Sequence, residues 1–209
     1  MYLNKSRVDT LSDGVFAIVM TLLVLEINIP HSTANVLITP SELLRDILQM
    51  SPLYATYIIS FAVLSIFWTS HHTIFHYYAK TTNKALVQLN MLFLAIIALI
   101  PFSSRLLSEF HYNQTAVIMY GANMLLAGIV TIFLFTYALK SREIYNGETT
   151  PTAIKQTTLR LFMTPSFAIF GIFASFVSIP ASLILFAFPI IFNIIPGTIT
   201  YMEKKLRLI

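Results

Sequence analysis

Apolar residues occur along this chain in long runs, without the two-residue alternation that is typical of a strand. Six runs approach 20 residues each, the length that an α-helix needs to cross the hydrocarbon core of a bilayer. Runs of this length without alternation exclude a transmembrane β-barrel. The pattern predicts an all-α integral membrane protein, a single domain over residues 1–209, with six transmembrane helices at about residues 12–30, 53–76, 85–107, 116–139, 161–178 and 181–202.

Polar residues and helix breakers mark the connections between these runs. Thr39, Pro40 and Glu42 have the spacing of a capping box with proline at the first helical position. A short amphipathic helix is therefore expected before the second run, with a kink at Pro52. Residues 141–156 form the one clearly soluble connector. Two prolines are expected to interrupt the sixth helix: Pro189 and Pro196.

The first run could also be the apolar part of a signal peptide. Asp9 and Asp13 would be unusual in the basic start of a signal peptide, and no small-residue cleavage site follows the run. We therefore interpret it as the first transmembrane helix.

Composition and charge support a membrane protein and orient it. The chain is 56% hydrophobic and 11% charged, whereas soluble domains carry about 25% charged residues. It has no cysteine, which excludes disulfides and thiolate metal sites. Of its 13 Lys and Arg residues, 11 fall on one side of the predicted helices and 2 on the other, so both termini are expected in the cytoplasm. No soluble module concentrates the net charge of +4, so no nucleic-acid partner is expected.

Two groups of polar residues lie near the predicted cytoplasmic ends of the first two helices, where charges close to lipid need partners. The first group is Arg7, Ser12 and Asp13, and the second is Trp68, His71, His72 and His76. Asp13 can accept a hydrogen bond from Arg7, from a histidine of the second group or from the Trp68 indole. We interpret six of these residues as a structural polar clamp that fixes the rotation of the first helix: Arg7, Ser12, Asp13, Trp68, His71 and His72.

The same residues allow two other interpretations. Histidines titrate near neutral pH, so the group could be a proton relay or a pH sensor. His72 and His76 lie one helical turn apart, but no third ligand or HExxH motif accompanies them, and no metal or cofactor is expected. Because the motifs of nucleophilic and phosphate-binding enzymes are absent, the chain is not expected to be an enzyme. A TVGYG potassium filter is also absent from the sequence.

Three segments resemble the potassium-channel family of endosomes and lysosomes, in its prokaryotic single-repeat branch. Residues 7–14, RVDTLSDG, resemble the family signature RxxxFSDG, with Leu11 in the place of phenylalanine. Residues 68–72, WTSHH, resemble the Trp/His element of the family, and residues 100–107, IPFSSRLL, resemble its third-helix motif.

This resemblance implies a potassium-permeable cation channel that assembles as a homotetramer in the cell membrane of a prokaryote, with lipid as its surroundings and K⁺ as the permeant ion. It also implies that the first helix lines the pore, with Ile18, Leu22 and Leu25 as an apolar constriction. Thr21 lies beside them as a candidate for cation coordination and selectivity, and Glu26 lies at the outer mouth.

Spacing is compatible with this placement but does not require it. Ile18, Leu22 and Leu25 are related as i, i+4 and i+7 and so share one stripe of a helix. Spacing alone favours ordinary helix-packing residues, and the family resemblance is what favours a pore. An alternative function is a proton-coupled secondary transporter that uses Asp13, His71 and His72.

Overall fold

The computed structural model describes residues 4–27, 39–145, 147 and 149–194. In this part of the chain there are helices and one isolated bridge between Ala79 and Tyr145, and no strand. The helical elements are α1 (Lys5–Leu22), η1 (Leu23–Glu26), α2 (Pro40–Gln49), α3 (Ser51–Thr73), η2 (Ile74–Tyr78), α4 (Lys84–Ile97), α5 (Ile100–Glu109), α6 (Gln114–Lys140), α7 (Pro151–Ala174) and α8 (Ile179–Ile194).

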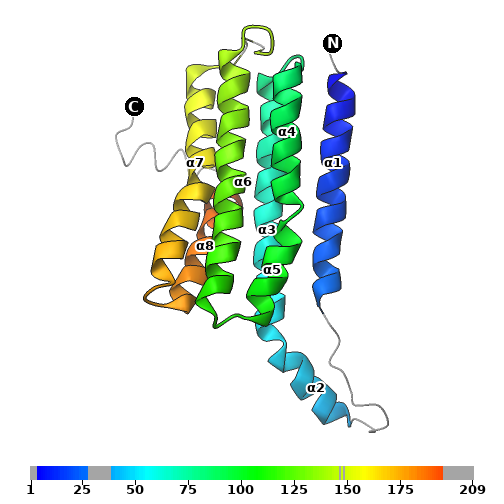
Figure 1. Cartoon of the computed structure of the whole chain (residues 1–209), viewed down its shortest axis with the longest axis vertical. Helices are drawn as coiled ribbons and strands as arrows, with labels where there is room; N and C mark the ends of the chain where they lie inside the picture. The colour runs from blue at the N-terminus through cyan, green and yellow to red at the C-terminus, as the bar shows by residue number, and fades with distance from the viewer. Residues whose placement is uncertain (1–3, 28–38, 146, 148, 195–209) are drawn as a thin grey trace.

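The long helices stand side by side as one bundle, and α1 occupies an edge of it (Figure 1). The helix α6 is the inner one, because 56% of its most apolar 18-residue window is buried, against 28% for the window of α1. The start of α1 and the end of α6 lie at the same end of the bundle, whereas α2 projects beyond the opposite end (Figure 1).

Five helical segments are long and apolar enough to cross a membrane, which confirms the predicted all-α membrane class. They are Lys5–Glu26, Ser51–Tyr78, Lys84–Glu109, Gln114–Lys140 and Pro151–Ala174. The sixth predicted helix corresponds to α8, which has 16 described residues. The end of that prediction, residues 195–202 with Pro196, lies outside the described residues.

Several predicted boundaries differ from the structure. Asn4 caps α1, which begins seven residues before the predicted position 12. Thr150 caps α7, so the last residues of the predicted connector 141–156 are helical. The third predicted helix is divided into α4 and α5 by a turn at residues 98–99, because Pro101 lacks the N–H that would continue the helical ladder. Pro189, in contrast, lies within α8 and does not interrupt it.

The predicted capping box and the break near Pro52 are both present. The Glu42 backbone N–H donates to Thr39 Oγ1, and the Thr39 backbone N–H donates to the Glu42 carboxylate over 2.9 Å. The Thr39 hydroxyl also donates to the Glu42 carboxylate over 2.8 Å, and the two hydrogen bonds that this carboxylate accepts from Thr39 lower the pKa of Glu42. Pro52 lies in the first turn of α3, and α2 and α3 run in different directions (Figure 1).

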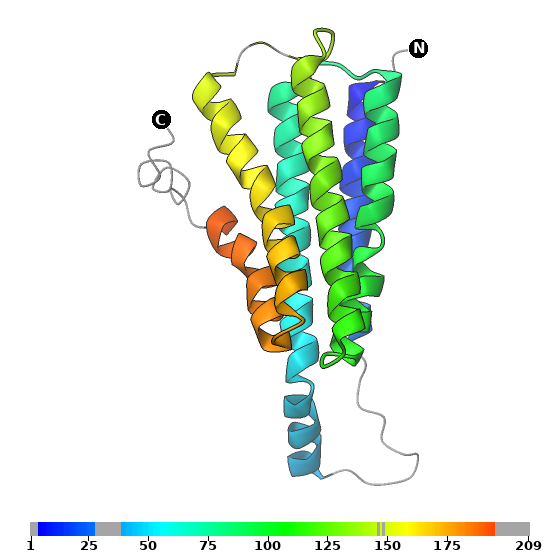
Figure 2. The same cartoon turned by 60° about the vertical axis from the view of Figure 1, so that its left-hand side comes forward.

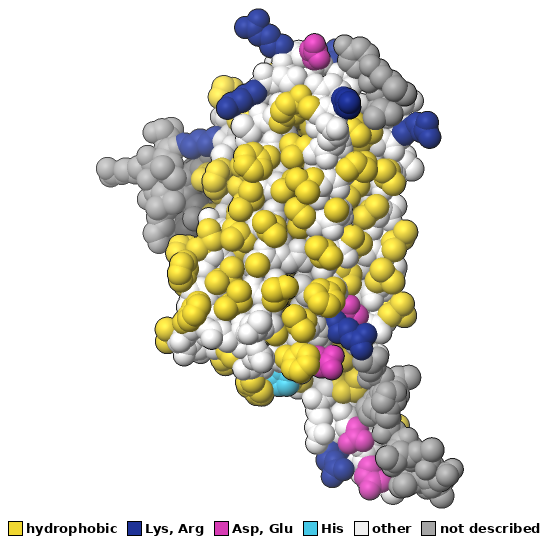
Figure 3. Space-filling view, in the orientation of Figure 1, with side chains coloured by type: hydrophobic (Ala, Val, Ile, Leu, Met, Phe, Trp, Pro, Cys, Tyr) yellow, Lys and Arg dark blue, Asp and Glu magenta, His cyan; other side chains and the backbone are white. Residues whose placement is uncertain are grey.

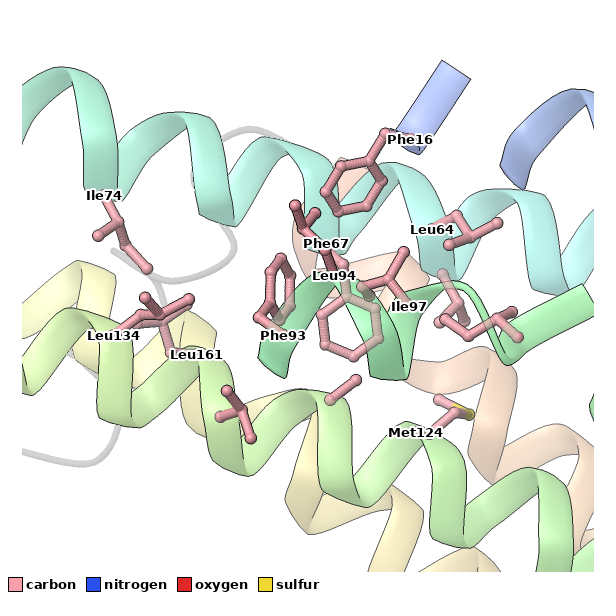
Figure 4. Close-up of a cluster of buried hydrophobic side chains, with 14 of the residues drawn as sticks. Phe16, Leu64, Phe67, Ile74, Phe93, Leu94, Ile97, Met124, Leu134 and Leu161 are labelled. Atoms are coloured by element: carbon pink, nitrogen blue, oxygen red, sulfur yellow. The ribbon is translucent and has the colours of Figure 1, made fainter. Parts of the chain in front are cut away.

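The core lies where α1, α3, α4 and α6 meet. Phe16, Phe67 and Phe93 pack against one another there, with ring centroids 5.9 Å apart for Phe16 and Phe93 (Figure 4). Close approach of α6 and α7 requires a missing side chain, since a Cβ on Gly128 would lie 2.8 Å from Pro165 Cδ.

The surface shows the layers of a membrane protein. A broad apolar band covers the middle of the bundle, and Lys and Arg side chains gather at the end where α1 begins (Figure 3). Acidic and basic side chains lie together near the opposite end (Figure 3). The chain is therefore a multi-pass membrane protein.

Candidate functional site

The helix α1 has a buried face and an exposed face. The buried residues are Val8, Ser12, Phe16 and Val19, followed by Leu23 in η1. The exposed aliphatic stripe consists of Leu11, Ile18, Leu22 and Leu25, with exposed fractions of 47%, 60%, 43% and 71%. At 3.6 residues per turn the two faces are centred about a third of a turn apart. The three predicted constriction residues therefore do not pack inside their own chain.

The geometry at the end of α1 aligns part of this stripe. The helix tightens into the 3₁₀ turn η1 at Leu23–Glu26, with Leu22 as its cap. Side chains three residues apart eclipse in such a turn, so Leu22 and Leu25 lie one above the other. Thr21 borders them and is exposed, and its hydroxyl donates to the carbonyls of Ala17 (3.0 Å) and Ile18 (2.8 Å). Its remaining oxygen lone pairs are available to a cation.

The buried face of α1 is held by hydrogen bonds to α3 and α4. Asn90 Nδ2 donates to Ser12 Oγ over 3.0 Å, and Asn90 Oδ1 lies 2.9 Å from His71 Nε2. Ser12 and Asn90 are 0% exposed and His71 is 3% exposed. We call Ser12, His71 and Asn90 the inner polar cluster. Because each side chain has a partner, the cluster fixes the rotation of α1 without leaving its own polar atoms unsatisfied.

A second contact ties α1 to α3 nearer the surface. Trp68 Nε1 donates to Asp13 Oδ1 over 2.9 Å, which selects one of the three donors that the sequence allows. The Trp68 ring stacks on His72 with centroids 5.7 Å apart, and His72 stacks on His76 at 5.4 Å. Among the described residues no group of three His, Cys, Asp or Glu side chains is arranged to hold a metal ion.

Arg7 is not brought into this arrangement. It is exposed, and none of the ion pairs between described residues involves it. Asp9 instead pairs with Lys5 at 3.1 Å, and its other carboxylate oxygen, Oδ1, is buried without a hydrogen-bond partner in the described part of the chain. Asp9, Asp13 and the histidines line a small cavity of about 110 Å³. The role of all six predicted clamp residues as one unit remains a prediction.

Glu26 lies apart from the exposed stripe. It lines a cavity of about 350 Å³ between η1, α3 and α5, together with Arg105 and Glu109. Arg105 Nε lies 3.8 Å from Glu109 Oε2, and His111 also lines this cavity. Its place at the end of α1 opposite the N-terminus keeps Glu26 a candidate for the outer mouth.

Sequence reasoning missed Asn90 and a second polar network. Asn90 lies in the middle of an apolar run, and that position alone is a signal, because an amide in lipid needs a partner. The second network joins three helices, with Ser60 Oγ 2.9 Å from Ser104 Oγ and 3.1 Å from the Tyr120 hydroxyl. Serines bond readily to their own backbone, so the sequence offers no comparable signal there.

Comparisons with known proteins agree with this architecture. Residues 7–101 match the family described as endosomal/lysosomal potassium channel TMEM175. A potassium channel of Streptomyces collinus is 30% identical over 186 residues, which cover 87% of each chain. A potassium channel of Chamaesiphon minutus is 29% identical over 179 residues, which cover 84% of this chain and 86% of that channel.

A solved structure and an animal relative add to these matches. The crystal structure of a lysosomal potassium-selective channel TMEM175 homolog from Chamaesiphon minutus superposes with a TM-score of 0.77, at 28% identity, over 90% of this chain and 95% of that chain. The endosomal/lysosomal proton channel TMEM175 of Gallus gallus is 39% identical over 111 residues, or 52% of this chain and 22% of that protein. These relatives are ion channels and not enzymes.

Proposed function

Because the chain belongs to the endosomal/lysosomal potassium channel family TMEM175, we propose that this channel protein conducts K⁺ passively through a pore lined by α1 of four copies. The observation that carries the proposal is the exposed aliphatic stripe. A helix held on one face by the inner polar cluster presents Ile18, Leu22 and Leu25 outward from its own chain. One chain has α1 at its edge (Figure 1), so a central pore requires several copies.

Four copies of the stripe around one axis form three stacked apolar rings, one each from Ile18, Leu22 and Leu25. Helical carbonyls are already bonded within the ladder and cannot replace the water shell of an ion as filter carbonyls do. An ion therefore loses part of its water at an apolar neck, and K⁺ loses water more easily than Na⁺. The ring at Ile18 closes the pore by dewetting when it is narrow.

Thr21 adds polar groups beside the apolar rings, and Glu26 adds them beyond the ring of Leu25. A ring of Thr21 hydroxyls offers lone pairs to a passing cation, because the hydroxyl protons are donated to the preceding turn. Glu26, beside Arg105 and Glu109, places an acidic side chain near the outer mouth. Cations gather where acidic side chains line an entrance.

The orientation follows from the distribution of charge. We place the end at which α1 begins in the cytoplasm of a prokaryote, with the protein in the cell membrane. The described cations at that end include Lys5, Lys84, Lys140 and Arg142, whereas Arg45 and Arg105 lie toward the other end. An excess of Lys and Arg marks the cytoplasmic side.

Purified protein in K⁺-loaded liposomes tests the function. A channel discharges the gradient without a coupled solute, and bi-ionic recordings give a reversal potential displaced toward the K⁺ equilibrium value. A K⁺ flux that requires a counter-transported proton would favour the transporter instead. Since animal relatives are named proton channels, a reversal potential that follows the proton gradient alone would contradict K⁺ as the main permeant ion.

A further inference from the structure

A polar cavity of about 270 Å³ opens between α3 and α7. The helix α7 stands on the side of the bundle away from α1 (Figure 1). Residues of η2 and of the first turns of α7 also line the cavity. Its polar lining includes Thr69, Ser70, Tyr77, Thr157, Arg160 and Asn193.

Side chains of α3, η2, α7 and α8 frame the cavity, and Asn193, near the end of the described part of α8, is the lining residue from that helix. Beyond that level α7 leans away from α3 (Figure 2). Tyr78 bridges the gap near the start of α7, where its hydroxyl lies 2.8 Å from Thr157 Oγ1 and 3.2 Å from the Ala153 carbonyl. Hydrogen bonds between Tyr78 and α7 therefore hold one end of the cavity.

The chemistry of the lining is cationic and rich in donors. Arg160 is exposed, and no carboxylate among the described residues forms an ion pair with it. None of the described residues that line the cavity is Asp or Glu. The hydroxyls of Ser70 and Tyr77 form no hydrogen bond with another described residue, so they can donate to a ligand. In contrast, the cavity beside Glu26 and Glu109 carries two acids.

The position of Arg160 along α7 matches the headgroup layer of a bilayer. Two residues later the outward side chains become apolar, with Phe162 50% exposed and Phe170 58% exposed. The helix α7 begins at the end of the bundle where α1 begins (Figure 1), and Lys and Arg side chains gather at that end (Figure 3). A guanidinium at this boundary lies level with lipid phosphates, and it can hold two phosphate oxygens at once.

We propose that this cavity binds the phosphate of an anionic phospholipid headgroup, from the leaflet at the end of the bundle where α1 begins. Arg160 binds the phosphate oxygens, and Ser70 and Tyr77 donate to the phosphate or to headgroup hydroxyls. The acyl chains lie against the apolar surface that starts at Phe162. Basic pockets between membrane helices bind anionic headgroups in this way. The proposal goes beyond ion conduction and does not depend on it.

The test is equilibrium lipid binding to the full chain in neutral detergent, measured by native mass spectrometry. We expect phosphatidylglycerol to bind more tightly than phosphatidylcholine. Arg160→Gln is expected to weaken phosphatidylglycerol binding about tenfold, the effect of losing a charge-assisted hydrogen bond. It should weaken phosphatidylcholine binding less, because the choline cation of that headgroup already opposes binding beside a guanidinium. Ser70→Ala keeps the charge and is expected to weaken binding about twofold to threefold.

Arg142→Gln is the matched control, because it removes the same charge from the exposed connector outside the cavity. It should leave the binding of both lipids unchanged. Equal losses in the Arg160 and Arg142 variants would mean that only overall charge matters, which overturns the site. Displacement of phosphatidylglycerol from the wild-type chain by inorganic phosphate at equal concentration would assign the cavity to the free anion and overturn the lipid assignment. Since no ion flux is measured, a failure of conduction does not affect the outcome.

Discussion

The two faces of α1 differ in what holds them. On one face Ser12, Phe16 and Val19 are each at most 3% exposed, and Ser12 is bonded through Asn90 to His71. On the other face Ile18 and Leu25 are at least 60% exposed and contact little of their own chain. Both faces are largely apolar, so hydrophobicity alone does not distinguish them. The difference is a hydrogen-bonded anchor on one side, which determines that the other side faces outward.

The largest expected effect comes from removing the buried side of this comparison. Phe16→Ala opens a cavity against Phe93 and His71, whose rings lie 5.9 and 6.2 Å from that of Phe16. We expect the free energy of unfolding to fall by about 3 kcal/mol. Leu22→Ala, on the exposed aliphatic stripe, should change it by less than about 0.5 kcal/mol. Denaturant titration in mixed micelles measures both, and similar losses would contradict the division into two faces.

Next in size is the loss of the hydrogen-bonded anchor. Asn90→Leu leaves the buried His71 Nε2 without its hydrogen-bond partner, whereas Ser12 keeps its bond to the Val8 carbonyl. One unsatisfied buried group costs about 2 kcal/mol. We expect a loss of that size in the free energy of unfolding. Gln88→Leu is the control, because it removes an amide from an exposed position of the same helix. An Asn90→Leu chain as stable as the wild type would show that the inner polar cluster does not hold α1.

The exposed face is tested by conductance. Ile18→Asn places an amide in the proposed apolar neck, which favours water there, so the leak current through reconstituted protein should rise severalfold. Ile18→Leu keeps the ring apolar at nearly the same volume and should leave the current unchanged. An unchanged current in the Ile18→Asn variant, with normal expression and assembly, would place the narrowest point elsewhere.

How much of this arrangement the sequence predicts depends on the kind of signal. The long apolar runs predict the membrane helices, because length and charge are read directly from the sequence. The turn between Ile97 and Ile100 is not predicted, because the third predicted helix runs over residues 85–107 without a break at Pro101. Pro189 is expected to interrupt α8, but it lies within the helix. A proline removes one backbone N–H from the helical ladder, and the remaining hydrogen bonds can continue the helix around it. Proline therefore marks a change in hydrogen bonding more reliably than a break.

In the candidate site, too, some features can be read from the sequence and others depend on the folded chain. Spacing placed Ile18, Leu22 and Leu25 on one stripe, but spacing could not tell whether the stripe is buried or exposed. That answer depends on Asn90 and His71, which are far from α1 in sequence and fix its rotation through contacts that only the folded chain contains. The choice of Trp68 as the donor to Asp13 required the rotation of α3 as well.

The smallest effect is expected at Thr21, the polar residue beside the exposed stripe. Its hydroxyl is bonded to the preceding turn at 2.8 and 3.0 Å, so Thr21→Ala removes lone pairs from the pore without leaving a backbone group unsatisfied. We expect the K⁺ over Na⁺ permeability ratio to fall about twofold, which corresponds to only a few tenths of a kcal/mol. Thr10→Ala is a close control, because that hydroxyl is also exposed on α1 and donates to the Ser6 carbonyl at 2.8 Å, but it lies two turns before the neck. Equal reversal potentials for wild type and Thr21→Ala would leave partial dehydration at the apolar rings as the sole source of selectivity. A similar shift in both variants would instead mean that the outward face of α1 acts along its whole length.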